Sequence, residues 1–305
     1  MSLKIAAFLD DPIDAFNIDL ASYRQYFATD DVLWLSKTES EFHDHLPEAD
    51  IAVVWQFSES DYQRARALKA VFTPAAGKDW VAADPSGRVP VYRGSFHGEI
   101  MAESLLAMML YFNVDLSTQL KQQQLRQFER QSLSHRRLLR NQTALIVGFG
   151  EIGRRCGERL SQMGMQVAGI RRCDQPYRDR QSNITVYPLA SLLSLLADAD
   201  HVINILPGEA REFFNIDHFR QMQTQSYFYN LGRGSTVNEA DLILALEQGQ
   251  IAGAGLDVFA TEPLPSDHPF WQMAQVLISP HSACIYQDYG RLFVDDMMTH
   301  LNGLR

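Results

Sequence analysis

A glycine-rich segment near the middle of the chain has the spacing of a dinucleotide-binding turn. The sequence reads GFGEIG there, so Gly148, Gly150 and Gly153 occupy the glycine positions of a GxGxxG motif. The apolar run TALIV precedes the motif, and CGERLSQM, which is typical of a helix, follows it. Glycines at a strand-to-helix turn let the backbone approach a pyrophosphate at the positive end of a helix. The segment therefore predicts dinucleotide binding by these glycines together with Glu151 and Ile152.

Two arginines follow the next apolar run, where an acidic residue is typical of an NAD site. Such a site places Asp or Glu about 20 residues past the glycines to accept hydrogen bonds from the ribose. Here QVAGI is followed by Arg171 and Arg172. Guanidinium groups cannot accept those bonds but pair well with a 2′-phosphate, which favours NADP over NAD. An alternative stays open, in which both arginines are merely exposed and Asp174 binds the ribose of NAD.

Two series of short apolar runs separated by helical stretches must position these residues. The alternation of apolar runs and helical stretches predicts βαβ units and parallel sheets covered by helices on both faces. Between the two series, residues 98–128 are predicted to form one long helix that connects two domains, apolar in its first half and polar in its second. The expected strands are 4–9, 32–35, 51–57, 70–72 and 89–92 in the first series, and in the second TALIVG, QVAGI, 201–206, YFYNLG and VLISP.

Three segments of the second half resemble the D-isomer-specific 2-hydroxyacid dehydrogenases. They are YNLGRGSTVNEADLILALEQGQIAGAGLDVF, then TEPLP, then ISPHSA, in the family's order after the GxGxxG unit. The first half agrees more loosely, through TPAAGKD at 73–79 and MAESLLAMML. The resemblance implies an α/β protein in which a Rossmann doubly wound sheet is inserted in a flavodoxin-like substrate domain. We expect residues 1–98, completed by 286–305, to form the substrate domain and 99–285 to form the dinucleotide-binding domain.

The resemblance also implies the reacting residues, and the chemistry of these residue types agrees with it. Reduction of a 2-oxo acid needs a cation for the carboxylate and carbonyl, and a proton donor for the developing alkoxide. Arg233, inside a glycine pair after an apolar strand, is expected to bind the carboxylate bidentately. His281, after VLISP, is expected to protonate the carbonyl oxygen, and Glu262 to orient His281 and favour its protonated form.

The remaining expected contacts also follow from matching family positions. Ala76 and Gly77 are expected to offer backbone N–H groups to the substrate carboxylate. Lys78 stands where an apolar residue is common, so it either contacts an extra acidic group or faces solvent. Asp257, in GLDVF, is expected near the nicotinamide, with a structural acid as the alternative. Leu206 and Pro207 are expected beside the cofactor, although the loop after them is shorter than usual in the family.

Composition excludes several other classes of protein. The 305 residues are 46% hydrophobic and 21% charged, as in folded globular chains, and the net charge of −10 disfavours nucleic acid as a partner. The three cysteines are scattered without a CxxC pair, so we expect a reducing cytoplasm and no metal site. His43, Asp44 and His45 lack the spacing of metal ligands and are expected at the surface. Neither an export signal nor a membrane span is expected.

These observations together predict an enzyme that works as a homodimer. We expect it to transfer a hydride from NADPH, or less readily NADH, to a small 2-oxo acid such as glyoxylate or hydroxypyruvate, giving the D-2-hydroxy acid. The polar segment 113–140, rich in Gln and Arg, is expected to be a solvated helix face with a surface loop, or else a subunit contact. The alternative function is a nucleotide-sensing binding protein similar to the corepressors called C-terminal binding proteins.

Overall fold

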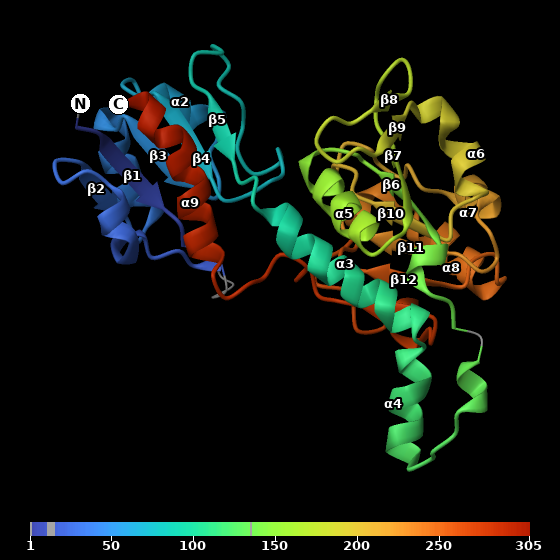
Figure 1. The fold of residues 1–305 in the computed structure, drawn as a ribbon. Coiled ribbons are helices and arrows are strands. Elements are labelled where there is room, and N and C mark those ends of the chain that lie inside the picture. Colours follow the sequence, from blue (N-terminus) through green and yellow to red (C-terminus); the bar gives the residue numbers. More distant parts are fainter. Residues whose placement is uncertain (1, 11–15, 135) are drawn as a thin grey trace. The chain divides into compact units, whose positions relative to one another are not determined.

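A computed structural model describes residues 2–10, 16–134 and 136–305. The chain divides into two compact units, Met1–His97 with Ile285–Arg305 and Gly98–Cys284, here called unit 1 and unit 2. Each unit is built on its own sheet with helices around it (Figure 1). The roles expected of the two parts, substrate binding and nucleotide binding, stay predictions at this stage.

Unit 1 is a five-stranded parallel sheet in the order β2-β1-β3-β4-β5. This is the flavodoxin-like order, with its switch point between β1 and β3. Every residue of β3 and β4 is buried, as expected for central strands covered on both faces. The strands are β1 (Lys4–Phe8), β2 (Val32–Leu35), β3 (Ile51–Val54), β4 (Ala70–Thr73) and β5 (Val91–Arg93), and the helices are α1 (Glu39–His45), α2 (Glu59–Arg64) and α9 (Tyr289–Leu301).

The end of the chain returns to unit 1 through α9, drawn in red in Figure 1. Arg305 donates to both carboxylate oxygens of Asp31, at 3.0 and 2.6 Å, and the Asp31 side chain is fully buried. Ser95, which follows β5, donates to Asp296 on α9 through its amide and its hydroxyl. These polar contacts hold the C-terminal segment to elements that lie more than 200 residues earlier in the sequence.

Unit 2 is an eight-stranded sheet in the order β13-β12-β11-β10-β6-β7-β9-β8, parallel except where β8 pairs with β9. Its central order is that of a Rossmann fold, which starts at β6 and winds outward in both directions. The strands are β6 (Thr143–Val147), β7 (Gln166–Ile170), β8 (Tyr177–Arg178), β9 (Thr185–Tyr187), β10 (His201–Asn204), β11 (Tyr227–Asn230), β12 (Gly253–Leu256) and β13 (Val276–Ile278). The helices are α3 (His97–Asn113), α4 (Leu116–Leu125), α5 (Glu151–Gln162), α6 (Leu192–Leu196), α7 (Ile216–Gln221) and α8 (Glu239–Glu247).

The prediction of one helix over 98–128 is wrong, because the chain bends by 63° between α3 and α4. Asp115 adopts a left-handed conformation, with φ of 49°, and its carboxylate accepts a hydrogen bond from the amide of Thr118. It therefore caps a new helix instead of continuing the old one. A second left-handed residue, Arg126, ends α4. In the described part of the chain, no single helix is long and apolar enough to cross a membrane, and α3 and α4 reach that length and apolarity only when counted together.

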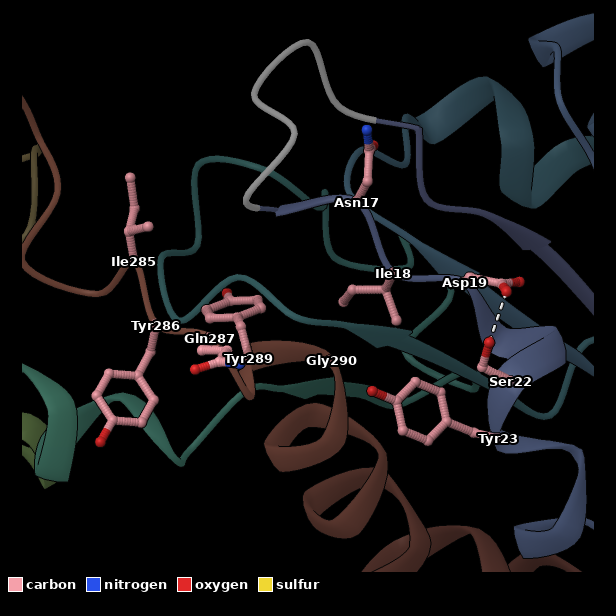
Figure 2. A pocket seen from close by; sticks show the side chains of 10 residues that line it. All are labelled: Asn17, Ile18, Asp19, Ser22, Tyr23, Ile285, Tyr286, Gln287, Tyr289 and Gly290. Carbon is pink, nitrogen blue, oxygen red and sulfur yellow. Dashed lines mark hydrogen bonds between the residues drawn. The ribbon is translucent and has the colours of Figure 1, made fainter.

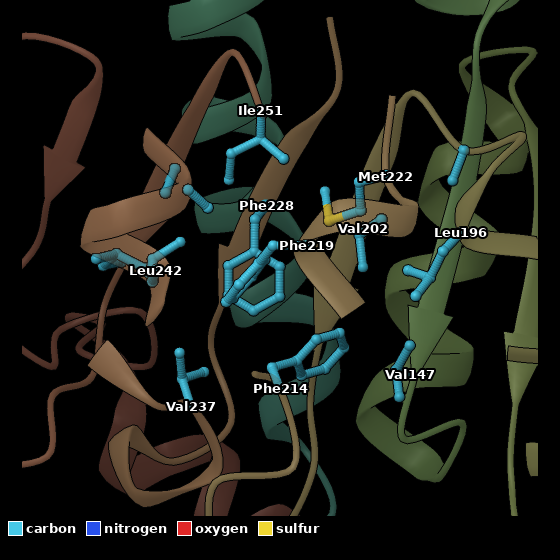
Figure 3. Close-up of a cluster of buried hydrophobic side chains, with 14 of the residues drawn as sticks. Val147, Leu196, Val202, Phe214, Phe219, Met222, Phe228, Val237, Leu242 and Ile251 are labelled. Atoms are coloured by element: carbon cyan, nitrogen blue, oxygen red, sulfur yellow. The ribbon is translucent and has the colours of Figure 1, made fainter. Parts of the chain in front are cut away.

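The sheet of unit 2 has a hydrophobic cluster on each face. Alternate residues of β6 point to opposite faces, so Leu145 joins one cluster while Ala144 joins the other. Figure 3 shows the first cluster, in which the rings of Phe214, Phe219 and Phe228 meet at centroid distances of 4.9 to 6.3 Å. With both faces covered, the sheet is a rigid support for the loops at its edges.

The register of unit 2 brings the carboxyl ends of its central strands level with one another. Asn204 at the end of β10 pairs with Val147 on one side and Asn230 on the other, and Asn230 pairs with Leu256. Ile278, the last residue of β13, pairs with Leu256 in turn. The loops that follow these strands therefore leave the sheet along one edge, where ligands of open α/β sheets bind.

Candidate active site

His281 lies in the loop that follows β13 and has a strained backbone. Its φ is 50°, a left-handed conformation that is uncommon for a residue with a side chain. The His281 amide donates to the carbonyl oxygens of Asp257 at 2.8 Å and Ser279 at 3.1 Å, and these bonds hold the turn in place. Strain of this kind persists only where the surroundings enforce it, and it is common at functional sites.

The Asp257 side chain anchors the same loop. It is 2% exposed and accepts hydrogen bonds from the Ser279 hydroxyl at 2.5 Å, the Ser282 amide at 2.9 Å and the Ala283 amide at 3.1 Å. A buried carboxylate with three such donors is satisfied by the protein alone. This geometry favours the structural interpretation of Asp257, while its expected place near the nicotinamide stays a prediction.

Glu262 and His281 form an ion pair at the surface of this edge. Glu262 Oε2 lies 2.7 Å from His281 Nδ1, and Oε1 accepts from the Phe259 amide at 2.9 Å. The hydrogen bond that His281 donates to the Glu262 carboxylate raises the pKa of His281, outweighing the opposite effect of burial. Burial tends to raise the pKa of Glu262, but the His281 hydrogen bond, the Phe259 amide and nearby positive charge lower it overall. The pair thus favours the protonated imidazolium of His281. Glu262 binds its Nδ1, so Nε2 is the nitrogen that Glu262 does not contact.

Arg233 stands in the loop after β11, between two glycines that the packing requires. A Cβ on Gly234 would lie 1.9 Å from the backbone of Phe259, and one on Gly232 would lie 2.6 Å from the carbonyl oxygen of Leu206. The half-buried Arg233 donates through Nη1 to the Gly232 carbonyl at 2.9 Å. Its charge lowers the pKa of both Glu262 and His281. The structure therefore brings the three expected reacting residues together on one edge of unit 2.

Two buried polar residues at this edge were missed by the sequence analysis. Asn204 and Thr236 are both fully buried, and Asn204 Nδ2 donates to Thr236 Oγ1 at 2.7 Å. The one signal in the sequence is an asparagine inside the otherwise apolar run VINIL. The side-chain partners of Asn204 lie 26 and 32 residues further along the chain, so strand register was needed to find them.

A side chain is excluded at two of the three motif glycines but would find space at the third. A Cβ on Gly148, whose φ is 102°, would lie 2.4 Å from the carbonyl oxygen of Ile205, and one on Gly153 would lie 2.7 Å from the carbonyl oxygen of Gly148. A Cβ on Gly150 would have no atom of the described residues within 4 Å. Gly150 is the N-cap of α5 and has no side-chain cap, so the open space lies at the positive helix end. These residues fit the pyrophosphate of a dinucleotide.

The other expected cofactor residues also follow strand ends of unit 2. Arg171 and Arg172 come directly after β7 and are exposed, as is Asp174, so the alternative of ribose binding by Asp174 stays open. Glu151, at the start of α5, forms ion pairs with Arg154 and Arg155. Ile152, in the same turn of α5, packs against a core cluster, and Leu206 and Pro207 follow β10.

The residues expected to bind substrate in the first half of the chain lie in unit 1. Ala76 and Gly77 follow β4 and are half-buried, and Lys78 beside them is exposed. His43 and His45, expected at the surface, are half-buried, while Asp44 is exposed. His43 Nε2 lies 3.0 Å from Asp61 Oδ1, and the His45 ring stacks on Trp34 at a centroid distance of 4.8 Å, so both histidines have structural contacts within unit 1.

Unit 1 also contains a cavity of about 420 Å³. Figure 2 shows Asn17, Ser22 and Tyr23 on one side of it, with Asp19 accepting a 2.7 Å hydrogen bond from the Ser22 hydroxyl. Tyr286 and Gln287 lie on the other side. The described residues that line this cavity include none of those expected to bind substrate or nucleotide.

Comparisons with known proteins agree on one family. The family model for the NAD binding domain of D-isomer specific 2-hydroxyacid dehydrogenases matches residues 106–283. A glyoxylate/hydroxypyruvate reductase A from Serratia proteamaculans is 35% identical over 250 residues, which cover 78% of this chain and 77% of that protein. The protein of the same name from Yersinia enterocolitica is 32% identical over 251 residues, with the same coverage.

Solved structures with the same fold cover nearly the whole chain. A D-isomer specific 2-hydroxyacid dehydrogenase from Xanthobacter autotrophicus, solved with NADPH and MES, has a TM-score of 0.81 at 25% identity and covers 99% of this chain and 96% of its own. A glyoxylate/hydroxypyruvate reductase from Sinorhizobium meliloti has a TM-score of 0.80 at 24% identity, with the same coverage. At this identity the similarity shows a shared fold alone.

The family model and these relatives identify the chain as an NAD(P)-dependent oxidoreductase, and its Rossmann sheet carries Arg233, Glu262 and His281 on one edge. The chain belongs to the D-isomer specific 2-hydroxyacid dehydrogenase family. The predictions of family, fold class and type of enzyme are therefore confirmed. The alternative of a nucleotide-sensing corepressor finds no support in these comparisons.

Proposed function

We propose that this protein reduces small 2-oxo acids of the glyoxylate and hydroxypyruvate type to D-2-hydroxy acids, with NADPH as the preferred hydride donor. The observation that carries the proposal is the 2.7 Å pair of Glu262 and His281 within reach of the Arg233 charge. Relatives that are 30% to 35% identical over most of the chain carry the name glyoxylate/hydroxypyruvate reductase A, which supports this substrate class.

The three residues at the edge have distinct roles in the proposed reaction. Arg233 binds the substrate carboxylate and polarises the carbonyl next to it. His281 donates the proton on Nε2 to the carbonyl oxygen as the hydride reaches the carbonyl carbon, so a 2-oxo acid, a hydride and a proton give the 2-hydroxy acid. Glu262 holds Nδ1 and stabilises the imidazolium before that transfer.

The nucleotide supplies the hydride, and unit 2 has residues that fit each of its parts. Gly148, Gly150 and Gly153, with Glu151 and Ile152, cradle the pyrophosphate at the start of α5. Leu206 and Pro207 would flank the nicotinamide half, and Asp257 would lie near it while its carboxylate anchors the loop of His281. Arg171 and Arg172 pair with the 2′-phosphate of NADP. The structure of the Xanthobacter relative with NADPH supports this preference.

We also propose a substrate-binding role for the loop after β4 in unit 1. The backbone N–H groups of Ala76 and Gly77 bind the substrate carboxylate from a loop at the carboxyl end of β4. The exposed Lys78 is available to an acidic substituent on a larger 2-oxo acid. Turnover of a 2-oxo diacid as well as glyoxylate by this protein would support that role of Lys78.

We also propose that the protein is a cytoplasmic homodimer. The segment from α4 onward exposes Leu120 at 46%, Leu125 at 56% and Phe128 at 88%, an apolar surface suited to a second copy. The three cysteines are free, as is usual in a reducing compartment. Sedimentation at micromolar concentration should give about twice the chain mass, and Leu120→Glu should shift it toward one chain. A stable monomer with full activity would contradict the dimer.

The proposed reaction is tested by mixing the protein with NADPH and a panel of 2-oxo acids while following the nicotinamide absorbance. We expect turnover of glyoxylate or hydroxypyruvate, and chiral chromatography of the products should give the D isomer where the product is chiral. His281→Ala is the control, since it should bind NADPH normally but turn over slowly. Nucleotide binding without turnover of any acid would instead support a sensing role.

A further inference from the structure

Three uncharged polar side chains meet in the core of unit 2 beneath the Arg233 loop. Asn204, Asn230 and Thr236 are each 1% exposed or less. Asn204 Nδ2 donates to Asn230 Oδ1 at 3.0 Å and to Thr236 Oγ1 at 2.7 Å. A buried amide or hydroxyl destabilises the fold unless its hydrogen bonds are made, so the network allows only one arrangement of these residues.

The network ends on the backbone of Arg233. The Arg233 carbonyl oxygen accepts from Thr236 Oγ1 at 2.6 Å and from Asn230 Nδ2 at 3.2 Å. The Gly232 amide, one residue earlier, donates to Asn230 Oδ1 at 3.2 Å. Buried side chains therefore hold the peptide groups next to Arg233, which fixes the point from which the guanidinium extends.

The same network reaches a second loop. Asn204 Oδ1 accepts from the Leu206 amide at 3.1 Å, next to Pro207 in the loop proposed to flank the cofactor. One side chain thus connects the loop after β10 with the loop after β11. We propose that Asn204 and Thr236 are positioning residues, which fix Arg233 for the substrate and connect its loop to the nucleotide-contacting loop; this rests on the proposed function of Arg233.

The neighbouring strands show that the sheet itself does not need polar residues at these positions. Val147 and Leu256 occupy the matching register positions on β6 and β12, beside Asn204 and Asn230, and both are apolar. Among these four described strands, the polar residues stand on the two whose loops carry Leu206 and Arg233. The network therefore serves the loops rather than the pairing of the strands.

The test compares Thr236→Val with Thr236→Ser in the full-length protein. Valine keeps the shape but removes the hydroxyl, whereas serine keeps it. We expect Thr236→Val to lower kcat/KM for glyoxylate by roughly 3- to 10-fold, mainly through a higher KM, as for loss of one hydrogen bond. The Kd of NADPH, from its fluorescence without acid, should stay within about twofold, and Thr236→Ser should stay close to wild type.

Asn204→Leu tests the connection between the loops. Because it removes the bond to the Leu206 amide as well, it should weaken NADPH binding and also lower kcat/KM for glyoxylate, each by roughly 3- to 10-fold. Thermal melting checks that both variants fold. If Asn204→Leu does not fold, the comparison of Thr236→Val with Thr236→Ser alone tests whether the network positions Arg233. A Thr236→Val protein with the wild-type KM for glyoxylate, or a folded Asn204→Leu protein with the wild-type Kd for NADPH, would overturn the inference. A wild-type protein that reduces no 2-oxo acid would refute the proposed function instead.

Discussion

Removing the negative charge of Glu262 while keeping its shape tests how much of the proton donor's strength comes from the ion pair. Glu262→Gln leaves a neutral hydrogen-bond partner for His281 Nδ1 at the same position. A hydrogen bond to a charged group contributes about 1.5–3 kcal/mol. The two side chains are 36% and 42% exposed, so solvent screening reduces the loss to about 1–2 kcal/mol. This corresponds to a fall in kcat/KM of roughly 5- to 30-fold.

The direction of the pH effect follows from the same pair. The Glu262 hydrogen bond raises the pKa of His281, so Glu262→Gln should lower that pKa. The reduction needs protonated His281, and activity is lost as the pH rises through this pKa. The basic limb of the pH profile of kcat/KM should therefore move to lower pH. The Kd of NADPH, measured by fluorescence, should change little.

The double variant separates a working pair from two independent groups. His281→Ala should lower kcat by on the order of 10²–10⁴, the usual contribution of one positioned acid. Adding Glu262→Gln should then cost little more, because residues that act as a unit lose their joint effect with the first change. A basic limb that stays in place in Glu262→Gln, together with multiplicative losses in the double variant, would refute the reasoning. Glu262 would then be a structural acid that holds the Phe259 amide.

Three other perturbations have outcomes that the structure specifies. Replacing Arg171 with Asp and Arg172 with Ser should weaken NADPH binding by on the order of 10²-fold, because each arginine–phosphate pair contributes about 1.5 kcal/mol. The affinity for NADH should change little. Equal affinity of the wild-type protein for NADPH and NADH would contradict the NADP preference. Gly150→Ala should keep the wild-type melting temperature but weaken NADPH binding, whereas Gly153→Ala should lower the melting temperature, because only the Gly153 Cβ would meet protein atoms. Burial lowers the pKa of His201 to about 4. As the pH falls below 6.5, His201 is therefore protonated in the unfolded state but stays neutral in the folded state. The free energy of unfolding should fall by about 2 kcal/mol between pH 7 and 5. His201→Gln should reduce that slope in urea unfolding, and an unchanged slope would contradict the buried neutral state.

The sequence predicted the parts of the fold that depend on local pattern. The strands Val32–Leu35 and Gln166–Ile170 lie where the apolar runs placed them, because short apolar runs between polar helices leave few other arrangements. The break at Asp115 was not predictable in this way, since an aspartate between Val114 and Leu116 is equally compatible with a continuous helix surface. Its left-handed backbone and its bond to Thr118 became visible only in three dimensions.

The candidate site shows the same division between local and long-range information. The GxGxxG turn is a local signal, and the family resemblance supplied Arg233, Glu262 and His281. The packing reason for Gly234, a contact with the backbone of Phe259, depends on a loop 25 residues away and could not be read from spacing. The Asn204 network likewise depends on the register of two parallel strands, which a single sequence does not specify.

Each of the three proposed reacting residues is held by a buried side chain or a backbone group outside that set. The Asp257 carboxylate and carbonyl hold the turn of His281, the Phe259 amide holds Glu262, and Thr236 holds the carbonyl of Arg233. A half-exposed side chain gains precision only if its backbone is fixed, because its own rotamers are free to move in solvent. Changes at the buried residues should therefore affect turnover more than their distance from the substrate suggests, whereas changes at apolar positions of the same strand ends, such as Val147, should affect mainly stability.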